Sequence, residues 1–180
     1  YLGDGFEISP KLKANIGLRL SGFRKNQEGD YYYITPEPRL AVRYKLLPTI
    51  SLKASYTRMM QYVHLVSNSG GTLPTDVWYP SNKYVNPESA HQFAIGPSAS
   101  FLKGKYNISY EFYYKRMYNQ MDLRDGAQIF SNPKIEEEFV FGDGWTYGNE
   151  FFVEKKKGKF TGWVSYTLSW NWRQFDQINK

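Results

Sequence analysis

The sequence predicts an all-β fold: an antiparallel, up-and-down transmembrane β-barrel segment of about eight strands that belongs to a larger barrel. Apolar and polar residues alternate along most of the chain, short turns alternate with long loops, and aromatic residues make up 18% of a chain that is only 41% hydrophobic. Strand side chains point alternately to opposite faces, so such alternation indicates that the two faces meet different media. No apolar run approaches the ~20 residues of a spanning helix. A membrane crossing therefore requires a closed barrel.

The clearest predicted strand lies between Lys11 and Arg24. One of its faces carries Leu12, Ala14, Ile16, Leu18, Leu20 and Gly22, and the other carries Lys13, Asn15, Gly17, Arg19, Ser21 and Phe23. The pattern recurs at 39–46, 50–57, 92–101, 107–115 and 164–173, with further strands expected at 6–8 and 145–153. A cation facing lipid at mid-membrane would cost ~2–4 kcal/mol. We therefore expect Arg19, Arg39, Arg43 and Lys53 to face the lumen of the barrel.

The connections between these strands are alternately short and long. Short turns are expected near Ser9–Lys11, Leu47–Thr49, 103–105 and 156–159, and long loops at 25–32, 63–89 and 119–144. This odd-even rule is typical of outer-membrane barrels and is not a property of soluble β-sandwiches. Pro97 removes a backbone donor inside a strand, which predicts a β-bulge there.

Composition excludes several kinds of function. The absence of cysteine excludes disulfides, thiolate metal sites and cysteine nucleophiles. The net charge of +6 comes from residues scattered along strands, whereas nucleic-acid binding needs a clustered basic face. Neither a nucleophile motif nor the ligand spacing of a metal site is present, so we expect no enzyme, cofactor or metal. Glu136, Glu137 and Glu138, with Asp122 and Asp125, are interpreted as solvated loop charge rather than a calcium site.

Several segments, taken in order, resemble the TonB-dependent outer-membrane receptors of Bacteroidetes-type bacteria. The resemblance lies in Ser67-Asn68-Ser69-Gly70, in Leu73-Pro74-Thr75-Asp76-Val77-Trp78, in Asn86-Pro87-Glu88, and in residues 52–59, 142–150 and 158–169. It implies the C-terminal part of a barrel of about 22 strands with an N-terminal plug. It also implies an outer-membrane location, contact with lipid, uptake of a nutrient such as a siderophore, cobalamin or an oligosaccharide, and contact with the TonB complex through the plug.

Residues 1–180 are expected to form one partial barrel domain without the plug and the remaining strands. Tyr1-Leu2-Gly3 is typical of a domain interior, and Asn179-Lys180 lacks the aromatic end of a final barrel strand. The exposed apolar face of the isolated segment is expected to require membrane-like surroundings, the rest of the barrel, or self-association. Two alternatives remain open: a complete small eight-stranded barrel that acts as an adhesin or structural protein, and a soluble β-sandwich that binds carbohydrate.

The loop at 63–90 contains the candidate ligand-binding residues. Its aromatic rings can stack on a ligand, and its polar groups can fix hydrogen bonds. The candidates are Trp78, Tyr79, Asp76, His64 and Asn82. A structural interpretation competes with this one, in which Trp78 and Tyr79 pack the loop onto the rim of the barrel. Trp170 and Trp172 are expected in an aromatic girdle, and Trp163 on the lumenal face.

Overall fold

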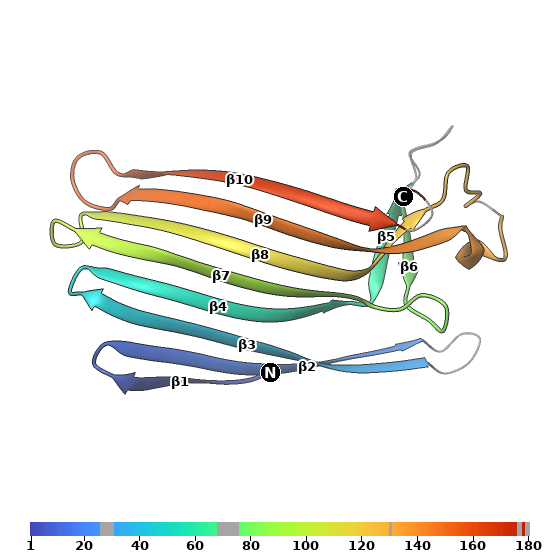
Figure 1. The fold of residues 1–180 in the computed structure, drawn as a ribbon, viewed down its shortest axis with the longest axis horizontal. Helices are drawn as coiled ribbons and strands as arrows, with labels where there is room; N and C mark the ends of the chain where they lie inside the picture. The colour runs from blue at the N-terminus through green and yellow to red at the C-terminus, as the bar shows by residue number, and fades with distance from the viewer. Residues whose placement is uncertain (26–30, 68–75, 130, 176–177, 179–180) are drawn as a thin grey trace.

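The main element of the structure, a computed structural model that describes residues 1–25, 31–67, 76–129, 131–175 and 178, is one antiparallel sheet (Figure 1). Its eight strands follow the order β1-β2-β3-β4-β7-β8-β9-β10, which confirms the predicted all-β, up-and-down fold. The strands are β1 (Leu2–Ser9), β2 (Leu12–Lys25), β3 (Tyr31–Leu47), β4 (Ile50–Gln61), β7 (Glu88–Phe101), β8 (Tyr106–Leu123), β9 (Phe139–Lys155) and β10 (Gly162–Phe175). A hairpin of β5 (Val63–Ser67) and β6 (Asp76–Pro80) and a 3-10 helix, η1 (Ile135–Glu138), complete it.

The two faces of the sheet differ in chemistry, as the alternation predicts. Residues that oppose each other in an antiparallel pair share a face. Ile16 opposes Leu40 on one face, and the next position along the strand, Gly17, opposes Arg39 on the other. The predicted lumenal cations share this second face, since the ladder pairs Arg19 with Glu37 and Arg43 with Lys53. Trp163 also lies on it, stacked on Phe152, whereas Trp170 and Trp172 lie on the apolar face with Tyr147.

The short and long connections lie at opposite ends of the sheet (Figure 1). The four short turns join β1 to β2, β3 to β4, β7 to β8 and β9 to β10, at the predicted positions. The hairpin and η1 lie at the other end, at the right in Figure 1. Residues 26–30 of one predicted loop, and residues 68–75, which carry part of the family-like motif, lie outside the described residues. The described residues include no helix long and apolar enough to cross a membrane.

Pro97 does not produce the predicted bulge. The β7–β8 pairing has the same register at Ile95 and at Ser98, and Leu52 of β4 still opposes Pro97. The sheet accommodates the proline through its neighbour Gly96, because a Cβ there would lie 1.8 Å from the carbonyl oxygen of Tyr110. Glycine thus lets the β8 backbone approach closely where the ladder is interrupted. The bulge prediction is wrong because it considered the missing donor without the residue beside it.

The apolar face of the sheet has no covering layer within the described residues. β1 and β10 are the edges of an open sheet, so this part of the chain forms neither a closed eight-stranded barrel nor a two-layer sandwich. Large side chains such as Ile16, Ile95 and Tyr166 are exposed. The buried apolar cluster lies instead at the loop end and contains Val66, Val85, Met121, Ile129 and Phe139. The exposed face fits a lipid-facing surface; self-association of the isolated segment stays a prediction.

Replacing Ile95 by arginine tests which medium the apolar face meets. Ile95 is 49% exposed and lies midway along the apolar rows. In the full-length protein in lipid vesicles, Ile95→Arg should lower the free energy of unfolding by about 2–4 kcal/mol. Chemical unfolding in vesicles measures this loss. Ser55→Arg, on the polar face of the neighbouring strand, is the control and should cost much less. Equal losses in the two variants would contradict a lipid-facing assignment.

Candidate functional site

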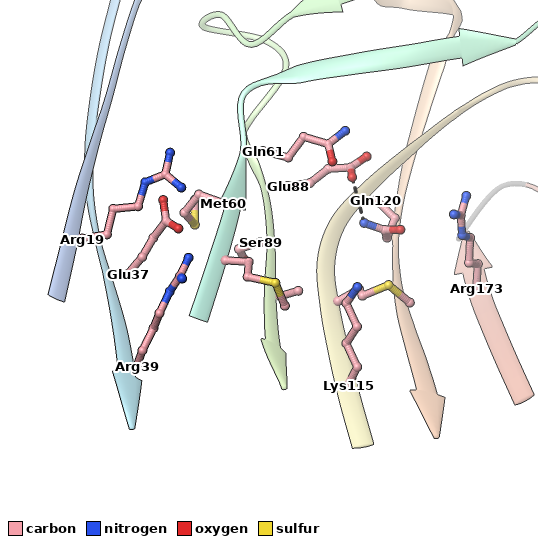
Figure 2. A pocket seen from close by; sticks show the side chains of 13 residues that line it. Arg19, Glu37, Arg39, Met60, Gln61, Glu88, Ser89, Lys115, Gln120 and Arg173 are labelled. Carbon is pink, nitrogen blue, oxygen red and sulfur yellow. Dashed lines mark hydrogen bonds between the residues drawn. The ribbon is translucent and has the colours of Figure 1, made fainter. Parts of the chain in front are cut away.

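The polar face contains a hollow of about 510 Å³ near the loop end of the sheet. Its lining comes from β2, β3, β4, β7, β8 and β10, so the sheet curves around it (Figure 2). Charged side chains dominate the lining: Arg19, Glu37, Arg39, Glu88, Lys115 and Arg173. Four cations therefore face two carboxylates. Within the part of the chain that the structure describes, Arg19, Arg39 and Lys115 form no ion pair, which leaves their charge available to a bound anion.

Glu88 is the best anchored of the two carboxylates. It accepts hydrogen bonds from Gln120 Nε2 at 3.1 Å and from the Met121 backbone amide at 3.3 Å. Its Oε1 also lies 3.4 Å from Nδ1 of His64, a side chain that is 2% exposed. Figure 2 shows Glu88 and Gln120 joined at the upper part of the hollow. Glu88 is thus occupied by these partners, and Glu37 lies opposite Arg19. With four cations and two carboxylates in its lining, the hollow is positive overall.

A second hollow of about 320 Å³ lies on the same face toward the short turns. Arg43 and Lys53 line it together with Ser51, Asn107 and Glu154. The Arg43 Nε donates to Ser51 Oγ at 3.0 Å, and Asn107 Nδ2 donates to Glu154 at 3.0 Å. Arg43 and Glu154 are thus bound to neighbours within the face. Among the described residues, the hollow near the loop end therefore has more cations without an ion-pair partner than the hollow near the short turns.

The β5–β6 hairpin follows the same alternation as the large sheet. Tyr79 opposes His64, and its ring packs edge-on against Phe139 with 4.9 Å between centroids. Trp78 opposes Leu65 on the other face of the hairpin and is 65% exposed. Parity therefore sends Tyr79 into the buried cluster and Trp78 toward solvent.

The five candidate ligand-binding residues have different surroundings. Buried His64 shares a hydrogen bond of 2.9 Å with Ser81 Oγ. Buried Asn82 accepts from the Tyr84 amide at 2.8 Å and the Val85 amide at 3.0 Å, which fixes the turn after β6. Asp76 opposes Ser67 at the start of β6. His64, Tyr79 and Asn82 thus hold the loop together, and the Trp78 side chain is accessible.

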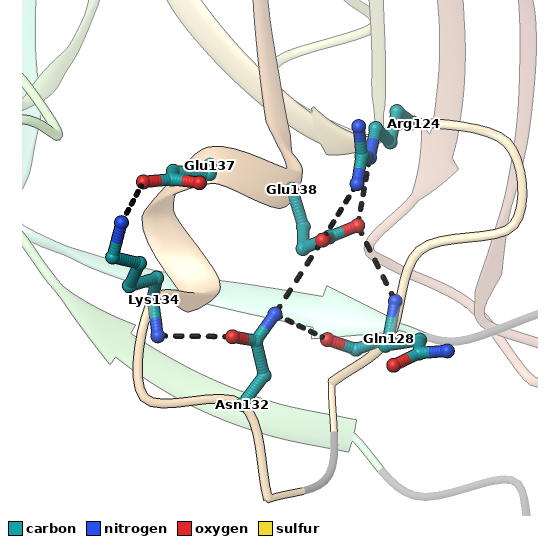
Figure 3. A network of polar contacts seen from close by, with 6 residues as sticks. All are labelled: Arg124, Gln128, Asn132, Lys134, Glu137 and Glu138. Atoms are coloured by element: carbon teal, nitrogen blue, oxygen red, sulfur yellow. Dashed lines mark hydrogen bonds and ion pairs between the residues drawn. The ribbon is translucent and has the colours of Figure 1, made fainter.

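Acidic residues after β8 form a network that sequence reasoning missed (Figure 3). Arg124 donates from Nε and Nη2 to the two oxygens of Glu138, each at 2.7 Å. Asn132 Nδ2 donates to Glu138 at 3.4 Å and to the Gln128 carbonyl at 3.0 Å. Glu138 is buried, so its interpretation as solvated loop charge is wrong. Glu137, paired with Lys134 at 3.0 Å, does remain at the surface.

Glu136 connects this network to the hairpin. Its carboxylate accepts hydrogen bonds from the Tyr79 hydroxyl and from Asn82 Nδ2, the latter at 3.4 Å. Lys25 of β2 lies 5.8 Å from the centre of the Tyr79 ring. Two loops far apart in sequence are therefore joined at one carboxylate. Across the described ranges, no three His, Asp or Glu residues gather as a metal site would require.

The family model described as "TonB dependent receptor-like, beta-barrel" matches residues 1–179. The chain belongs to this family. The family resemblance of the sequence is thereby confirmed; its Bacteroidetes type and the C-terminal position in the barrel stay predictions. In the receptor barrel, the polar face with its two hollows corresponds to the predicted lumenal wall, and the apolar face to the predicted lipid side.

Relatives and solved structures give the same fold. The chain is 22% identical, over 206 residues, to the probable TonB-dependent siderophore receptor PiuA of Acinetobacter baumannii, covering all of this chain and 27% of that protein. It matches the FpvAI–pyocin S2 complex with a TM-score of 0.70 at 17% identity, covering 97% of this chain and 24% of that one. It matches the alcaligin receptor FauA from Bordetella pertussis with a TM-score of 0.65 at 20% identity, covering 98% and 31%. The chain thus spans about a quarter to a third of these proteins.

Acidification should loosen the loop of the receptor barrel that contains the network. The hydrogen bonds from Arg124 hold the pKa of Glu138 below its ordinary value of 4.5. Burial, the largest single influence, raises the pKa of Glu136. The hydrogen bonds from Tyr79, from its own backbone amide and from Asn82, together with the charge of Lys25, outweigh burial, so the net shift is downward. Carboxylates with lowered pKa stabilise the loop above pH 4.5 and lose this contribution as pH falls through their lowered values. A spin label at Asp125→Cys should therefore become more mobile below pH 4.5.

Two variants make the pH test specific. Glu138→Gln should give a mobile label at neutral pH and remove most of the pH response. Lys134→Met, which breaks the exposed pair with Glu137, should leave the wild-type response, because exposed pairs contribute little. A label equally mobile at pH 7 and pH 3 in the wild type would show that the network does not order the loop.

Proposed function

We propose that this chain is part of an outer-membrane receptor that takes up an iron–siderophore complex in a TonB-dependent manner. The observation that carries the proposal is family membership over residues 1–179. The relatives support the cargo class: PiuA is named a probable siderophore receptor, and two similar structures are receptors of alcaligin and of ferripyoverdine. Such a receptor binds its cargo at the cell surface and moves it inward through the barrel, past a plug, without breaking bonds.

The charge of the larger hollow supports an anionic iron chelate as cargo. Arg19, Arg39 and Lys115 face it from β2, β3 and β8. Guanidinium groups bind oxyanions through paired, charge-assisted hydrogen bonds. A ferric complex held by several anionic oxygen ligands presents suitable acceptors. Cobalamin and oligosaccharides, the other cargoes that the resemblance implies, offer less negative charge to this wall.

The hairpin supplies a second element of the proposal. Trp78 is the accessible aromatic residue among the five candidates, and Tyr79, His64 and Asn82 fix the hairpin that carries it. An exposed indole on a fixed support can stack on an apolar or aromatic part of a ligand at small entropic cost. We assign Trp78 the first contact with cargo at the surface, and the arginines of the hollow a later one.

Removal of Arg19 and Arg39 tests the charge argument. In the full-length receptor, Arg19→Gln with Arg39→Gln should weaken binding of a ferric siderophore by roughly tenfold or more, since a hydrogen bond to a charged group contributes about 1.5–3 kcal/mol. Binding of radioactive iron–siderophore to cells in the cold measures affinity without transport. Uptake at growth temperature measures the complete process.

Arg43→Gln with Lys53→Gln is the matched control, because it removes two cations from the same face toward the short turns. Its effect on siderophore affinity should be small. Equal losses in both double variants would point to general lumenal charge rather than to the hollow. Cells whose growth depends on the receptor for cobalamin or an oligosaccharide, and not for iron, would refute the cargo class.

Trp78→Ala should weaken siderophore binding by about tenfold, or 1.4 kcal/mol, through loss of the stacking surface. Leu65→Ala is the control, since Leu65 opposes Trp78 on the same exposed face of the hairpin. Equilibrium binding to the purified receptor gives both affinities. If Trp78→Ala inserts normally and binds cargo as tightly as the wild type, Trp78 is not a ligand contact.

A further inference from the structure

The apolar face contains a row of cationic side chains at its loop end. Following the register from β4 to β10, the row reads Arg58, His91, Arg116, Trp145 and Trp172. Two residues further from the loops, the row on the same face reads Tyr56, Phe93, Tyr114, Tyr147 and Trp170. The next reads Ala54, Ile95, Phe112, Asn149 and Leu168. The basic row therefore borders the apolar band at its loop end.

This position matches the level of lipid headgroups. An outward arginine costs ~2–4 kcal/mol at mid-membrane and only ~0–1 kcal/mol near the interface. Tryptophan and tyrosine rings gather at the same interface. Arg58 and Arg116 thus occupy the level at which an outward cation is tolerated, and their neighbours Trp145 and Trp172 are the residues expected there.

The two arginines of the row have side-chain donors that neighbouring groups do not occupy. Arg58 donates from Nη1 to the Pro36 carbonyl at 3.4 Å, and its Nη2 has no hydrogen-bond partner among the described residues. The Arg116 guanidinium lies over the rings of Tyr118 and Trp145, at 5.4 and 5.5 Å from their centres. Its Nη2 donates to Asp143 at 2.9 Å. Aromatic faces on two sides hold Arg116 in place while leaving other donors of its fork without an ion-pair partner.

His91 connects the two arginines. It opposes Arg58 on β4 and Arg116 on β8. Its Nδ1 shares a hydrogen bond of 2.8 Å with the Tyr56 hydroxyl, which orients the ring. Two guanidinium groups and an imidazole therefore stand side by side against a single carboxylate, that of Asp143. The local charge is therefore positive at the loop end of the apolar face.

We propose that Arg58, His91 and Arg116 form a binding site for the phosphate-bearing headgroup of an anionic membrane lipid, whose acyl chains lie along the rows of Tyr56 and Ala54. We infer a lipid from the chemistry of neighbouring rows. The row nearest the loops carries cations with free donors, and the next two rows toward the short turns carry mainly aromatic and aliphatic side chains. A protein partner would have to cover both the basic row and the apolar rows and would have to displace the lipid from them. The inference rests on the proposed membrane location of the receptor but not on its cargo.

The test uses the full-length receptor in vesicles of phosphatidylcholine, with or without phosphatidylglycerol. Arg58→Gln with Arg116→Gln should reduce the retention of phosphatidylglycerol on the purified protein by roughly tenfold, through loss of charge-assisted hydrogen bonds. Native mass spectrometry counts the retained lipid. Arg58→Lys with Arg116→Lys keeps the positive charge at both positions. This variant should show an intermediate loss of retained phosphatidylglycerol, because a lysine ammonium lacks the paired donors of a guanidinium.

Lys103→Gln with Lys159→Gln is the charge-matched control, since both lysines belong to short turns at the opposite end. Equal lipid loss in this control, or displacement of the lipid by inorganic phosphate at equal concentration, would overturn the site. Ferric-siderophore binding measured on the same samples separates the two proposals. If the Arg58, Arg116 variant binds siderophore normally and retains as much lipid as the wild type, only the lipid site is refuted. If the receptor retains its lipid selectivity but does not bind siderophore, only the proposed cargo is refuted.

Discussion

The structure depends on the continuous antiparallel ladder that pairs each strand with the next. Because every strand hydrogen-bonds to its sequence neighbour or across the hairpin, one register fixes the faces of all eight strands. A shift of one residue in the pairings of β7 would place Ala94 where Ile95 now lies and bring polar side chains to the apolar side. The rows of like chemistry that cross five strands are the consequence of this register. They also create both the positive hollow inside and the basic border outside.

The sheet has little core of its own, so its loop end is stabilised differently from its strands. Val66, Val85 and Phe139 bury apolar surface beneath the hairpin. The hydrogen bond from Tyr79 to Glu136 then connects segments that β-sheet pairing does not join, and the hydrogen bonds from Arg124 to Glu138 reinforce the end of the β8–β9 pairing. The strands need an apolar surrounding on one side, whereas the loops carry their own small core. This division allows loop residues to differ between relatives without altering the wall.

Sequence reasoning succeeded where the physical cause is local and failed where it is not. Alternation is a property of consecutive residues, so the strands, their faces and the shared polar face of Arg19 and Arg43 could be predicted. The accommodation of Pro97 depends on Tyr110 of the neighbouring strand, and the burial of Glu138 depends on Arg124, fourteen positions away. His64 and Asn82 were candidates by residue type alone. Their partners Ser81 and Glu136 come together only through the fold.

Arginine occurs on both faces of this sheet, and its position decides its role. Thr57 and Arg58 are consecutive residues of a strand and therefore lie on opposite faces. Thr57 lies on the polar face opposite Arg39, and Arg58 lies on the apolar face opposite His91. In the proposed receptor, Arg19 and Arg39 face the lumen, where water can solvate them at any level along the strand. Outside, the energetic cost of a desolvated charge confines Arg58 and Arg116 to the border of the apolar band. If the proposals hold, an arginine on the apolar face indicates the membrane boundary, and an arginine on the polar face indicates the charge of the cargo.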